Sequence, residues 1–317
     1  MEKFAYKNAA TIVQAIAFLK AGHAAVLAGG TDILNLLKTG AFTHPPRTLV
    51  NIKNIPELDS IQEDVEGLTI GATVKLADIA SSKIVQSRCP ALAKAAISVA
   101  SPPIREMGTV AGNLCQEVQC WYFRRSFLTG TFFDCLRKGG SRCYAASGDS
   151  RYHAILGATQ CFAVCPSDTA VALAALDAVL RTNKRSIPIG SFFHALGNVL
   201  DEDEMVARIW VPTPKPGTRQ VFIKFAFRPA IDFAVASVAA AITVEHGKVS
   251  EARIVLGAVA PVPYRAHGAE DALQGNPISE PIAETAAAAA VRDAAPLADN
   301  KYKVPIIKTL VKRAILG

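Results

Sequence analysis

The sequence predicts a mixed helix and strand fold of two or three domains. At 317 residues the chain is longer than a single small core normally requires. Half of the residues are hydrophobic and 19% are charged, which is typical of a globular protein. Predicted helices and strands alternate along the chain. Pro212–Gly217, with three prolines and a glycine in six residues, separates residues 1–214 from residues 215–317.

The clearest local pattern near the N-terminus is a strand, a glycine-rich turn and a helix. Residues 11–22 first show the spacing of an amphipathic helix. Residues 24–28 then predict a short buried strand, which runs into Gly29–Asp32 and a helix over 33–38. Free N–H groups in such a turn, and at the helix N-terminus after it, favour a phosphate. A tight turn that needs glycine only for its backbone freedom is the alternative interpretation.

Further elements follow as far as the proline-rich boundary. Hydrophobic runs predict strands over 48–52, 68–70, 179–181 and 185–189 and helices over 76–86, 90–100 and 167–176. A second small-residue turn lies within residues 108–114, and two such turns can enclose one extended dinucleotide. Their spacing is not the GxGxxG of a Rossmann fold, and no acidic residue follows at the expected distance. We therefore do not expect a Rossmann fold.

The C-terminal region predicts a second mixture of strands and helices. Alternating hydrophobic residues predict a strand over 220–227, and an alanine-rich stretch predicts a helix over 233–240. The remaining predicted elements are strands over 241–245 and 253–260 and helices over 280–290 and 304–316.

Charge and hydropathy exclude several classes of function. The net charge is +7, but Lys and Arg are spread along the chain, which favours a solvated basic surface over a nucleic-acid site. The apolar stretch 233–244 is shorter than the ~20 residues that cross a bilayer. The N-terminus lacks the pattern of a signal peptide, so we expect a cytoplasmic protein. Seven cysteines without such a signal favour free thiols or metal ligands over a disulfide framework.

Four cysteines lie in one irregular stretch that is rich in Gly, Arg and Ser. They are Cys120, Cys135, Cys143 and Cys161, separated by 14, 7 and 17 residues. No CxxC pair is present, so the spacing does not fit a zinc finger or ribbon. Wide and uneven spacing is compatible with an iron–sulfur cluster, while free thiols with a chance disulfide explain it equally well. Cys115 and Cys165 flank the stretch as alternative ligands.

Four other polar residues have two interpretations each. Asp168 begins a predicted helix, where it either caps the N-terminus or binds a ribose. Lys224 and Asp232 lie among apolar residues, either at strand edges or in a cofactor cleft between domains. His153 is expected to be a hydrogen-bonded loop residue rather than a ligand or proton carrier.

Taken together, seven short segments resemble the FAD-binding subunit of the molybdenum hydroxylase family, which includes xanthine dehydrogenase. The segments, in order, are residues 27–34, 51–58, 70–73, 108–113, 166–168, 228–234 and 257–265. The resemblance implies an α+β fold: a two-subdomain FAD-binding fold of the PCMH or vanillyl-alcohol-oxidase type, with subdomains of about 1–58 and 59–214. It also implies a C-terminal α/β domain over 215–317 of the CO dehydrogenase flavoprotein type.

The same resemblance implies two cofactors, FAD and a [4Fe–4S] cluster. The cysteine stretch is similar to an insertion, here about 115–165, that carries an extra cluster in 4-hydroxybenzoyl-CoA reductase and periplasmic aldehyde oxidoreductase. Cys120, Cys135, Cys143 and Cys161 are then the metal ligands. The implied FAD contacts are Leu27, Ala28, Gly29, Gly30, Thr31, Asp32, Ile33, Thr109, Gly112, Asn113, Asp168, Lys224 and Asp232. The chain departs from the family at Glu106-Met107, Ala111 and Cys165.

By resemblance, the chain is an electron-transfer subunit without catalytic residues of its own. Its partners are then a molybdopterin-containing large subunit, a [2Fe–2S] small subunit and an external electron acceptor or donor. The expected substrate of the complex is an aldehyde, an aromatic compound or an N-heterocycle. Two alternatives stay open: a 4-hydroxybenzoyl-CoA reductase type, with electrons entering through the cluster, and a stand-alone flavin oxidoreductase. A partner subunit with an export signal would carry the complex to the periplasm.

Overall fold

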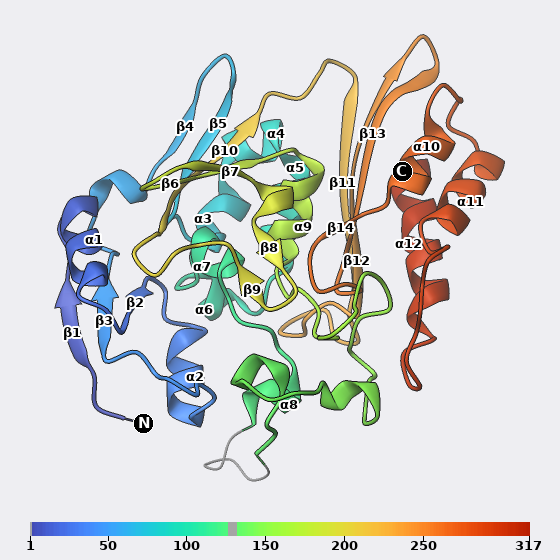
Figure 1. Cartoon of the computed structure of the whole chain (residues 1–317). Coiled ribbons are helices and arrows are strands. Elements are labelled where there is room, and N and C mark those ends of the chain that lie inside the picture. The colour runs from blue at the N-terminus through green and yellow to red at the C-terminus, as the bar shows by residue number, and fades with distance from the viewer. Residues whose placement is uncertain (1, 126–131) are drawn as a thin grey trace.

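The computed structural model describes residues 2–125 and 132–317 and contains three main β-sheets (Figure 1). The first sheet is parallel, with the strand order β1-β3-β2. Its elements are β1 (Ala5–Asn8), α1 (Ile12–Lys20), β2 (Ala24–Leu27), α2 (Ile33–Thr39) and β3 (Thr48–Asn51). Thr11 caps α1, since its side-chain oxygen accepts a hydrogen bond from the N–H of Gln14. The predicted strand, turn and helix over residues 24–38 are therefore confirmed.

The second sheet is antiparallel, with the order β4-β5-β10-β6-β7. Its strands are β4 (Ile61–Glu63), β5 (Gly67–Gly71), β6 (Val179–Thr182), β7 (Ser186–Pro188) and β10 (Val206–Pro212). The helices between them are α3 (Leu76–Ser81), α4 (Lys83–Arg88), α5 (Pro90–Ser98), α6 (Pro102–Arg105), α7 (Val110–Leu114) and α9 (Asp168–Ala175). The single helix predicted over 76–86 is wrong, because Ser82 has an extended backbone and caps a new helix.

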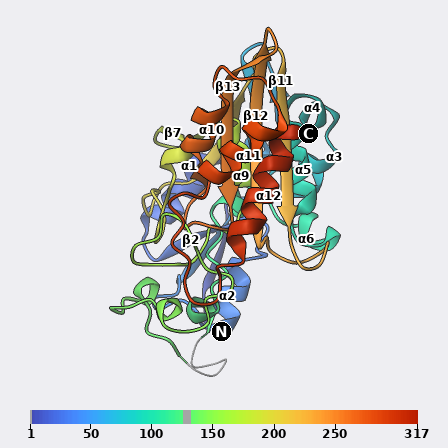
Figure 2. The same cartoon turned by 90° about the vertical axis from the view of Figure 1, so that its right-hand side faces the viewer.

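The third sheet is an antiparallel meander covered by helices on both faces. Its strands are β11 (Thr218–Phe225), β12 (Ala236–Glu245), β13 (Lys248–Gly257) and β14 (Tyr264–Arg265). On one face lie α10 (His267–Leu273), α11 (Glu280–Ala289) and α12 (Lys303–Leu316), and on the other lie α5 and α9 (Figures 1 and 2). No helix in the described part of the chain has both the length and the apolarity needed to cross a bilayer.

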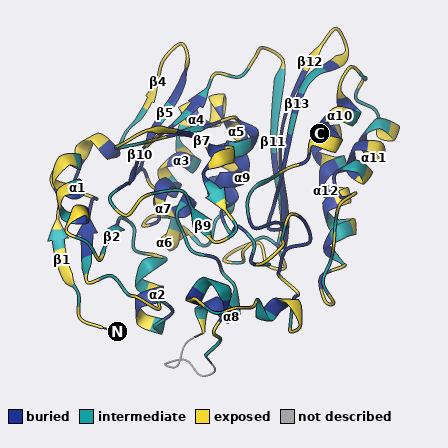
Figure 3. Cartoon of the chain, viewed as in Figure 1, coloured by how far each residue is buried: buried dark blue, intermediate teal, exposed yellow. Residues whose placement is uncertain are grey.

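The helix predicted over residues 233–240 is wrong, since this stretch leads into β12. The first eight residues of β12 are all buried, and Figure 3 shows the strand dark blue between its neighbours. A strand covered on both faces has no alternation of polar and apolar residues, so its sequence lacks the period of two. Alanine, the strongest helix former, then shifted the prediction toward helix. Packing between α9 and α12 overrides that preference.

In its described residues, the cysteine segment 115–165 has little regular structure: it contains α8 (Trp121–Arg124) and two 3₁₀ turns, Leu136–Lys138 and Tyr144–Ala146. Its C-terminal half is bound to the loop between β13 and β14, since the N–H of Ile155 donates to Val259 O and the N–H of Cys165 donates to Ala260 O. The part of the predicted insertion at 126–131 lies outside the described residues.

The remaining elements of the described residues are two short 3₁₀ turns, Pro56–Leu58 and Ile189–Ser191, and a small hairpin of β8 (Phe193–His194) and β9 (Gly197–Asn198).

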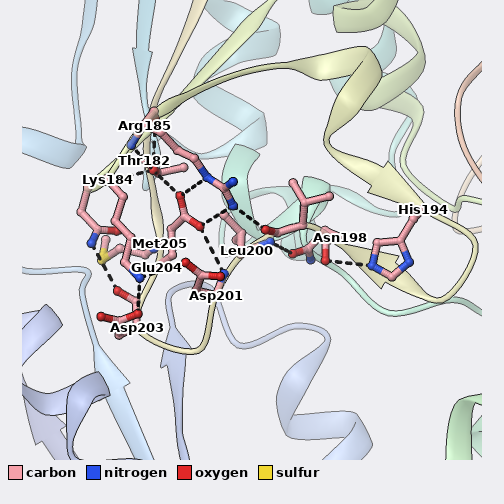
Figure 4. Close-up of polar contacts among 12 residues, drawn as sticks. Thr182, Lys184, Arg185, His194, Asn198, Leu200, Asp201, Asp203, Glu204 and Met205 are labelled. Carbon is pink, nitrogen blue, oxygen red and sulfur yellow. Dashed lines mark hydrogen bonds and ion pairs between the residues drawn. The ribbon is translucent and has the colours of Figure 1, made fainter.

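A buried carboxylate fixes the loop before β10 (Figure 4). Glu204 accepts hydrogen bonds from Arg185 and Thr182 and from the N–H of Asp201. Burial acts against ionisation, yet these bonds lower the pKa of Glu204 to about 2. Arg185 also donates to the carbonyl of Val199, directly after β9, so the hairpin is joined to the turn between β6 and β7.

A buried lysine joins α12 to the end of the third sheet. The side chain of Lys303 is fully buried, and its Nζ donates to the carbonyl of Ala258 at 2.7 Å. Ala258 has a φ of 58°, a left-handed conformation that is strained for a residue with a side chain. The hydrogen bond holds that conformation in place. Burial lowers the pKa of Lys303 to about 7.

We predict that Lys303→Met weakens the rise of stability with pH. Between pH 7 and 8 the unfolded chain keeps the lysine proton while the folded chain loses it, so folding becomes more favourable as the pH rises. Denaturant unfolding of the purified chain at both pH values should show a gain about 1 kcal/mol smaller in the variant. Buried thiols whose pKa is raised in the folded chain make folding less favourable as the pH rises, and they do so equally in the wild type and the variant. Exposed Lys301→Met is the control, and equal gains in wild type and Lys303→Met would contradict the prediction.

Candidate cofactor-binding site

The two small-residue turns predicted from the sequence lie against each other. A Cβ atom on Gly29 would come within 2.1 Å of the carbonyl oxygen of Met107, so only glycine allows this approach. A Cβ atom on Gly108 would lie 3.7 Å from the Thr31 hydroxyl oxygen. The turn after β2 and the turn before α7 therefore form one backbone surface, to which Leu27–Ile33 and Thr109–Asn113 belong.

Side-chain caps fix the second turn and connect it to α9. Thr109 caps α7 by accepting from the N–H of Gly112 at 3.2 Å. The buried Asn113 uses its side-chain oxygen to accept from the hydroxyls of Ser167 and Thr169, both at 2.6 Å. Ser167 in turn caps α9. The Asn113 side chain is therefore engaged within the protein, in a hydrogen-bond network that no local sequence pattern indicates.

Asp32 contacts the cysteine segment. Its carboxylate accepts from the N–H of Glu117 at 2.8 Å and from the Arg124 guanidinium at 2.6 Å. Arg124 also donates to the carbonyls of Glu117 and Val118. The ion pair is mostly buried, since 16% of the Arg124 side chain and 22% of the Asp32 side chain are exposed. Asp32 thus connects the start of α2 to the start of the cysteine segment.

Asp168 and Lys224 are neighbours, although 56 residues separate them. Lys224 Nζ lies 2.8 Å from Asp168 Oδ2 and donates to the carbonyl of Ser98 at 2.9 Å. Burial raises the pKa of Asp168, while Lys224 and the Ser98 hydroxyl oppose that rise. The pair joins α5, α9 and β11 at the place where the second and third sheets meet.

A cavity of about 490 Å³ opens beside this ion pair. Its walls come from the segments 119–121, 152–153, 163–171 and 227–234, together with Ser237 and Ala258. A cavity of this size, with a few polar groups on mostly apolar walls, is typical of a cofactor site. Asp168 and Asp232 line it, whereas Lys224 and the two small-residue turns do not. Asp232 accepts from the backbone and side chain of Arg228 at its edge.

The four predicted ligand cysteines come together around a second, smaller cavity. Cys120, Cys135, Cys143 and Cys161 all line it, with Tyr122, Phe123, Leu136, Arg137, Tyr144 and Ala163. None of the four is in a disulfide. The Arg137 side chain is 6% exposed and bonds to Glu117 and to the carbonyls of Ala195 and Leu196 in the β8–β9 hairpin. The structure thus brings together thiols that are distant in sequence and places a cation beside them.

The charge states of these thiols depend on one another. The Cys143 thiol donates to the Cys161 sulfur and lowers the pKa of Cys161 to about 5, with smaller help from Arg137 and against the effect of burial. The same hydrogen bond raises the pKa of Cys143. Burial raises the pKa of Cys120 to about 11, and the nearby Cys161 and Cys135 add to this rise. A positively charged group bound among the sulfurs would remove this mutual repulsion.

The described cysteines do not form a site for a single metal ion. Among residues 2–125 and 132–317, no three His, Cys, Asp or Glu side chains are arranged to hold one metal ion. The four thiolates of a [4Fe–4S] cluster bind four different iron atoms, so they need not approach as closely as the ligands of one ion. Of the alternative ligands, Cys165 lines the larger cavity and Cys115 lines neither.

His153 lies beside both cavities, and Lys303 bonds to a residue of the larger one. His153 Nε2 is 3.2 Å from Cys120 Sγ, and the side chain lines the larger cavity. Lys303 donates to the carbonyl of Ala258, which lines the same cavity. Burial, and next the charge of Lys303, lower the pKa of His153 to about 4, so the ring is neutral at pH 7. The sequence indicated His153 as a loop residue, whereas no local pattern singled out Lys303.

Two protein families match the chain. The FAD binding domain in molybdopterin dehydrogenase matches residues 2–214, and the CO dehydrogenase flavoprotein C-terminal domain matches residues 222–317. Among curated proteins, the chain is 32% identical to the aldehyde oxidoreductase FAD-binding subunit PaoB of Escherichia coli, over 97% of this chain and 96% of that one. It is 29% identical to the carbon monoxide dehydrogenase medium chain of Hydrogenophaga pseudoflava, over 99% and 96%.

Solved structures show the same architecture. A chain of carbon monoxide dehydrogenase from Hydrogenophaga pseudoflava superposes with a TM-score of 0.79 at 28% identity, covering 99% of this chain and 96% of that one. A chain of quinoline 2-oxidoreductase from Pseudomonas putida superposes with a TM-score of 0.76 at 25% identity, with the same coverage. The expected fold, an FAD-binding unit followed by a flavoprotein C-terminal domain, is therefore confirmed.

We predict that Gly29→Ala loses most of its bound FAD. The added methyl group meets the Met107 carbonyl, so the two turns must separate, at a cost of about 1–3 kcal/mol in stability. The ratio of flavin absorbance to protein measures the loss. Gly190→Ala is the matched control, because a Cβ there meets no atom within 4 Å. A Gly29→Ala protein with the FAD content of wild type would show that the contact between the turns is not needed.

Proposed function

Since the chain belongs to the family of FAD-binding domains in molybdopterin dehydrogenases, we propose that it is the electron-transfer subunit of a heteromeric molybdenum-containing oxidoreductase. It binds FAD and one [4Fe–4S] cluster. The observation that carries the proposal is the adjacency of two cavities, one large enough for a flavin ring and one lined by four free cysteines.

We assign the FAD pyrophosphate to the surface formed by the two turns. Leu27, Ala28, Gly29, Gly30, Thr31 and Ile33 face it from one side, and Thr109 and Gly112 face it from the other. The close approach at Gly29 supports this, because backbone N–H groups without side chains around them suit an anion. Asp32 and Asn113 act indirectly: their side chains hold the turns, and Arg124 neutralises the carboxylate that would repel a phosphate.

The flavin ring occupies the larger cavity. FAD supplies the exchange of electrons one or two at a time, while the protein orients the ring and sets its electrostatics. Asp168 is placed to accept from a hydroxyl of the FAD chain, and Lys224 holds that carboxylate in position. Asp232 closes the cavity edge through its pair with Arg228. None of these residues has the arrangement of a catalytic base next to a nucleophile.

The cluster is assigned to Cys120, Cys135, Cys143 and Cys161. Their shared cavity, the absence of disulfides among the described cysteines and the buried Arg137 support it. Arg137 offsets the negative charge of four thiolates.

The partners follow from how the relatives are named. Those proteins are called a FAD-binding subunit and a medium chain, so each is one part of a larger enzyme. We assign this chain to a complex with a molybdopterin-containing large subunit, which acts on an aldehyde, and a [2Fe–2S] small subunit. Electrons from that subunit leave through this chain to an external acceptor.

We predict that Cys135→Ser loses iron and acid-labile sulfide but keeps FAD. The cysteine belongs to the segment 115–165 and lines only the smaller cavity, so the FAD turns stay intact. Metal analysis and flavin absorbance measure the two cofactors separately. Cys89→Ser is the control, because Cys89 is a buried free thiol that lines neither cavity. Zinc in place of iron and sulfide in the wild-type protein would remove the cluster from the proposal.

We also predict that flavin reduction by an aldehyde requires the other subunits. The isolated chain, mixed anaerobically with aldehydes, should keep its flavin oxidised, whereas the tagged chain purified with its partners should be reduced. The flavin absorbance near its visible maximum reports both reactions. Substrate-dependent reduction in the isolated chain would instead support a stand-alone flavin oxidoreductase.

A further inference from the structure

The two cavities share a wall, and Cys120 is part of it. Cys120 and Ala163 line both the smaller cysteine cavity and the larger cavity, whereas Cys135, Cys143 and Cys161 line only the smaller one. Of the four thiols, Cys120 is therefore the one adjacent to the place proposed for the flavin. A group that bonds to its sulfur acts at the boundary between the two cofactors.

His153 is that group. Its Nε2 atom lies 3.2 Å from Cys120 Sγ, within the distance for a hydrogen bond to sulfur. The side chain is 2% exposed, and its other ring nitrogen, Nδ1, is buried without a hydrogen-bond partner. A thiolate bound to iron has no proton to donate. The ring nitrogen must therefore be the donor, which places the proton on Nε2.

Three contacts hold the imidazole in this position. Trp121 packs edge-on against the ring, with centroids 5.3 Å apart. The N–H of His153 donates to the carbonyl of Ser150, and the His153 carbonyl accepts from the side chain of Asn300 at 3.1 Å. Asp299 accepts from the Ser150 N–H and hydroxyl. The segment before α12 therefore fixes the loop that presents the ring.

A hydrogen bond to a ligand sulfur stabilises the reduced cluster more than the oxidised one. Reduction adds negative charge that is partly carried by the sulfurs, and a donor interacts more strongly with the more negative acceptor. Arg137 lines the smaller cavity, whereas His153 lines the larger one. The hydrogen bond from His153 therefore favours the cluster as an electron acceptor at the boundary between the two cofactors.

We infer that His153 is a positioning residue that donates its Nε2–H to the Cys120 sulfur and raises the reduction potential of the cluster. The inference rests on the proposed function, because it requires a cluster at the four cysteines. It adds that this hydrogen bond, which residues of the C-terminal region hold in place, shifts electron exchange between cluster and flavin toward the cluster.

Redox titration of the purified complex, followed by the electron paramagnetic resonance signal of the reduced cluster, tests the inference. His153→Phe should keep iron, sulfide and FAD while its cluster potential falls. At one fixed solution potential, the ratio of reduced to oxidised cluster should drop by roughly fivefold or more. His153→Gln keeps an N–H donor and should recover part of that loss. Tyr302→Phe, which removes a hydrogen bond to the Arg151 carbonyl in the same loop but none to sulfur, lines neither cavity and should leave the potential unchanged.

A measurement on the wild-type protein does not depend on how well a variant folds. With ¹⁵N-labelled histidine, pulsed electron paramagnetic resonance of the reduced cluster should detect coupling to a histidine nitrogen and to a proton that exchanges in D₂O. Absence of that coupling, or an unchanged potential in iron-replete His153→Phe, overturns the inference and leaves the cluster in place. A wild-type complex without iron and sulfide overturns both the cluster and the inference.

Discussion

The ion pair between Asp32 and Arg124 is the contact on which the joint arrangement of both cavities depends. In its described residues, the segment 115–165 has little regular structure, so no ladder of backbone hydrogen bonds holds that part of it. Asp32 fixes its start by binding both the Arg124 guanidinium and the N–H of Glu117. Breaking the pair would leave a mostly buried charge without a partner, which costs more than the pair itself contributes. The first turn and the cysteine segment are therefore held as one unit.

Further contacts attach this unit to two other parts of the fold. Arg137 binds the carbonyls of Ala195 and Leu196, and the hairpin that contains them is held in turn by the buried Glu204 (Figure 4). At its far end the segment bonds to Val259 and Ala260 beside the third sheet. The four thiols converge because their segment is fixed at its start, its middle and its end by three different parts of the fold.

Local patterns in the sequence predicted the parts of the fold that are locally determined. The strand, turn and helix over residues 24–38 follow from the spacing of apolar residues and from two glycines. The strand predicted over 241–245 is the second half of β12, but its first half was predicted as helix. Burial on both faces removes the alternation that identifies a strand, and that burial depends on helices more than fifty residues away. The pairing of Asp168 with Lys224 has no local sign either, since each residue alone is compatible with a cap or a strand edge. The cysteines could be singled out by type, whereas their convergence depends on anchors distant in sequence.

The C-terminal region does more than cover the larger cavity. It supplies part of that cavity's wall through residues 227–234 and Ala258, whose strained backbone is held by Lys303. Three residues before Lys303, Asn300 binds the carbonyl of His153 and so orients the ring toward Cys120. One short stretch at the start of α12 thus acts on both cavities, on one through the Ala258 carbonyl and on the other through the His153 backbone. Both contacts therefore depend on where the start of α12 lies relative to the third sheet.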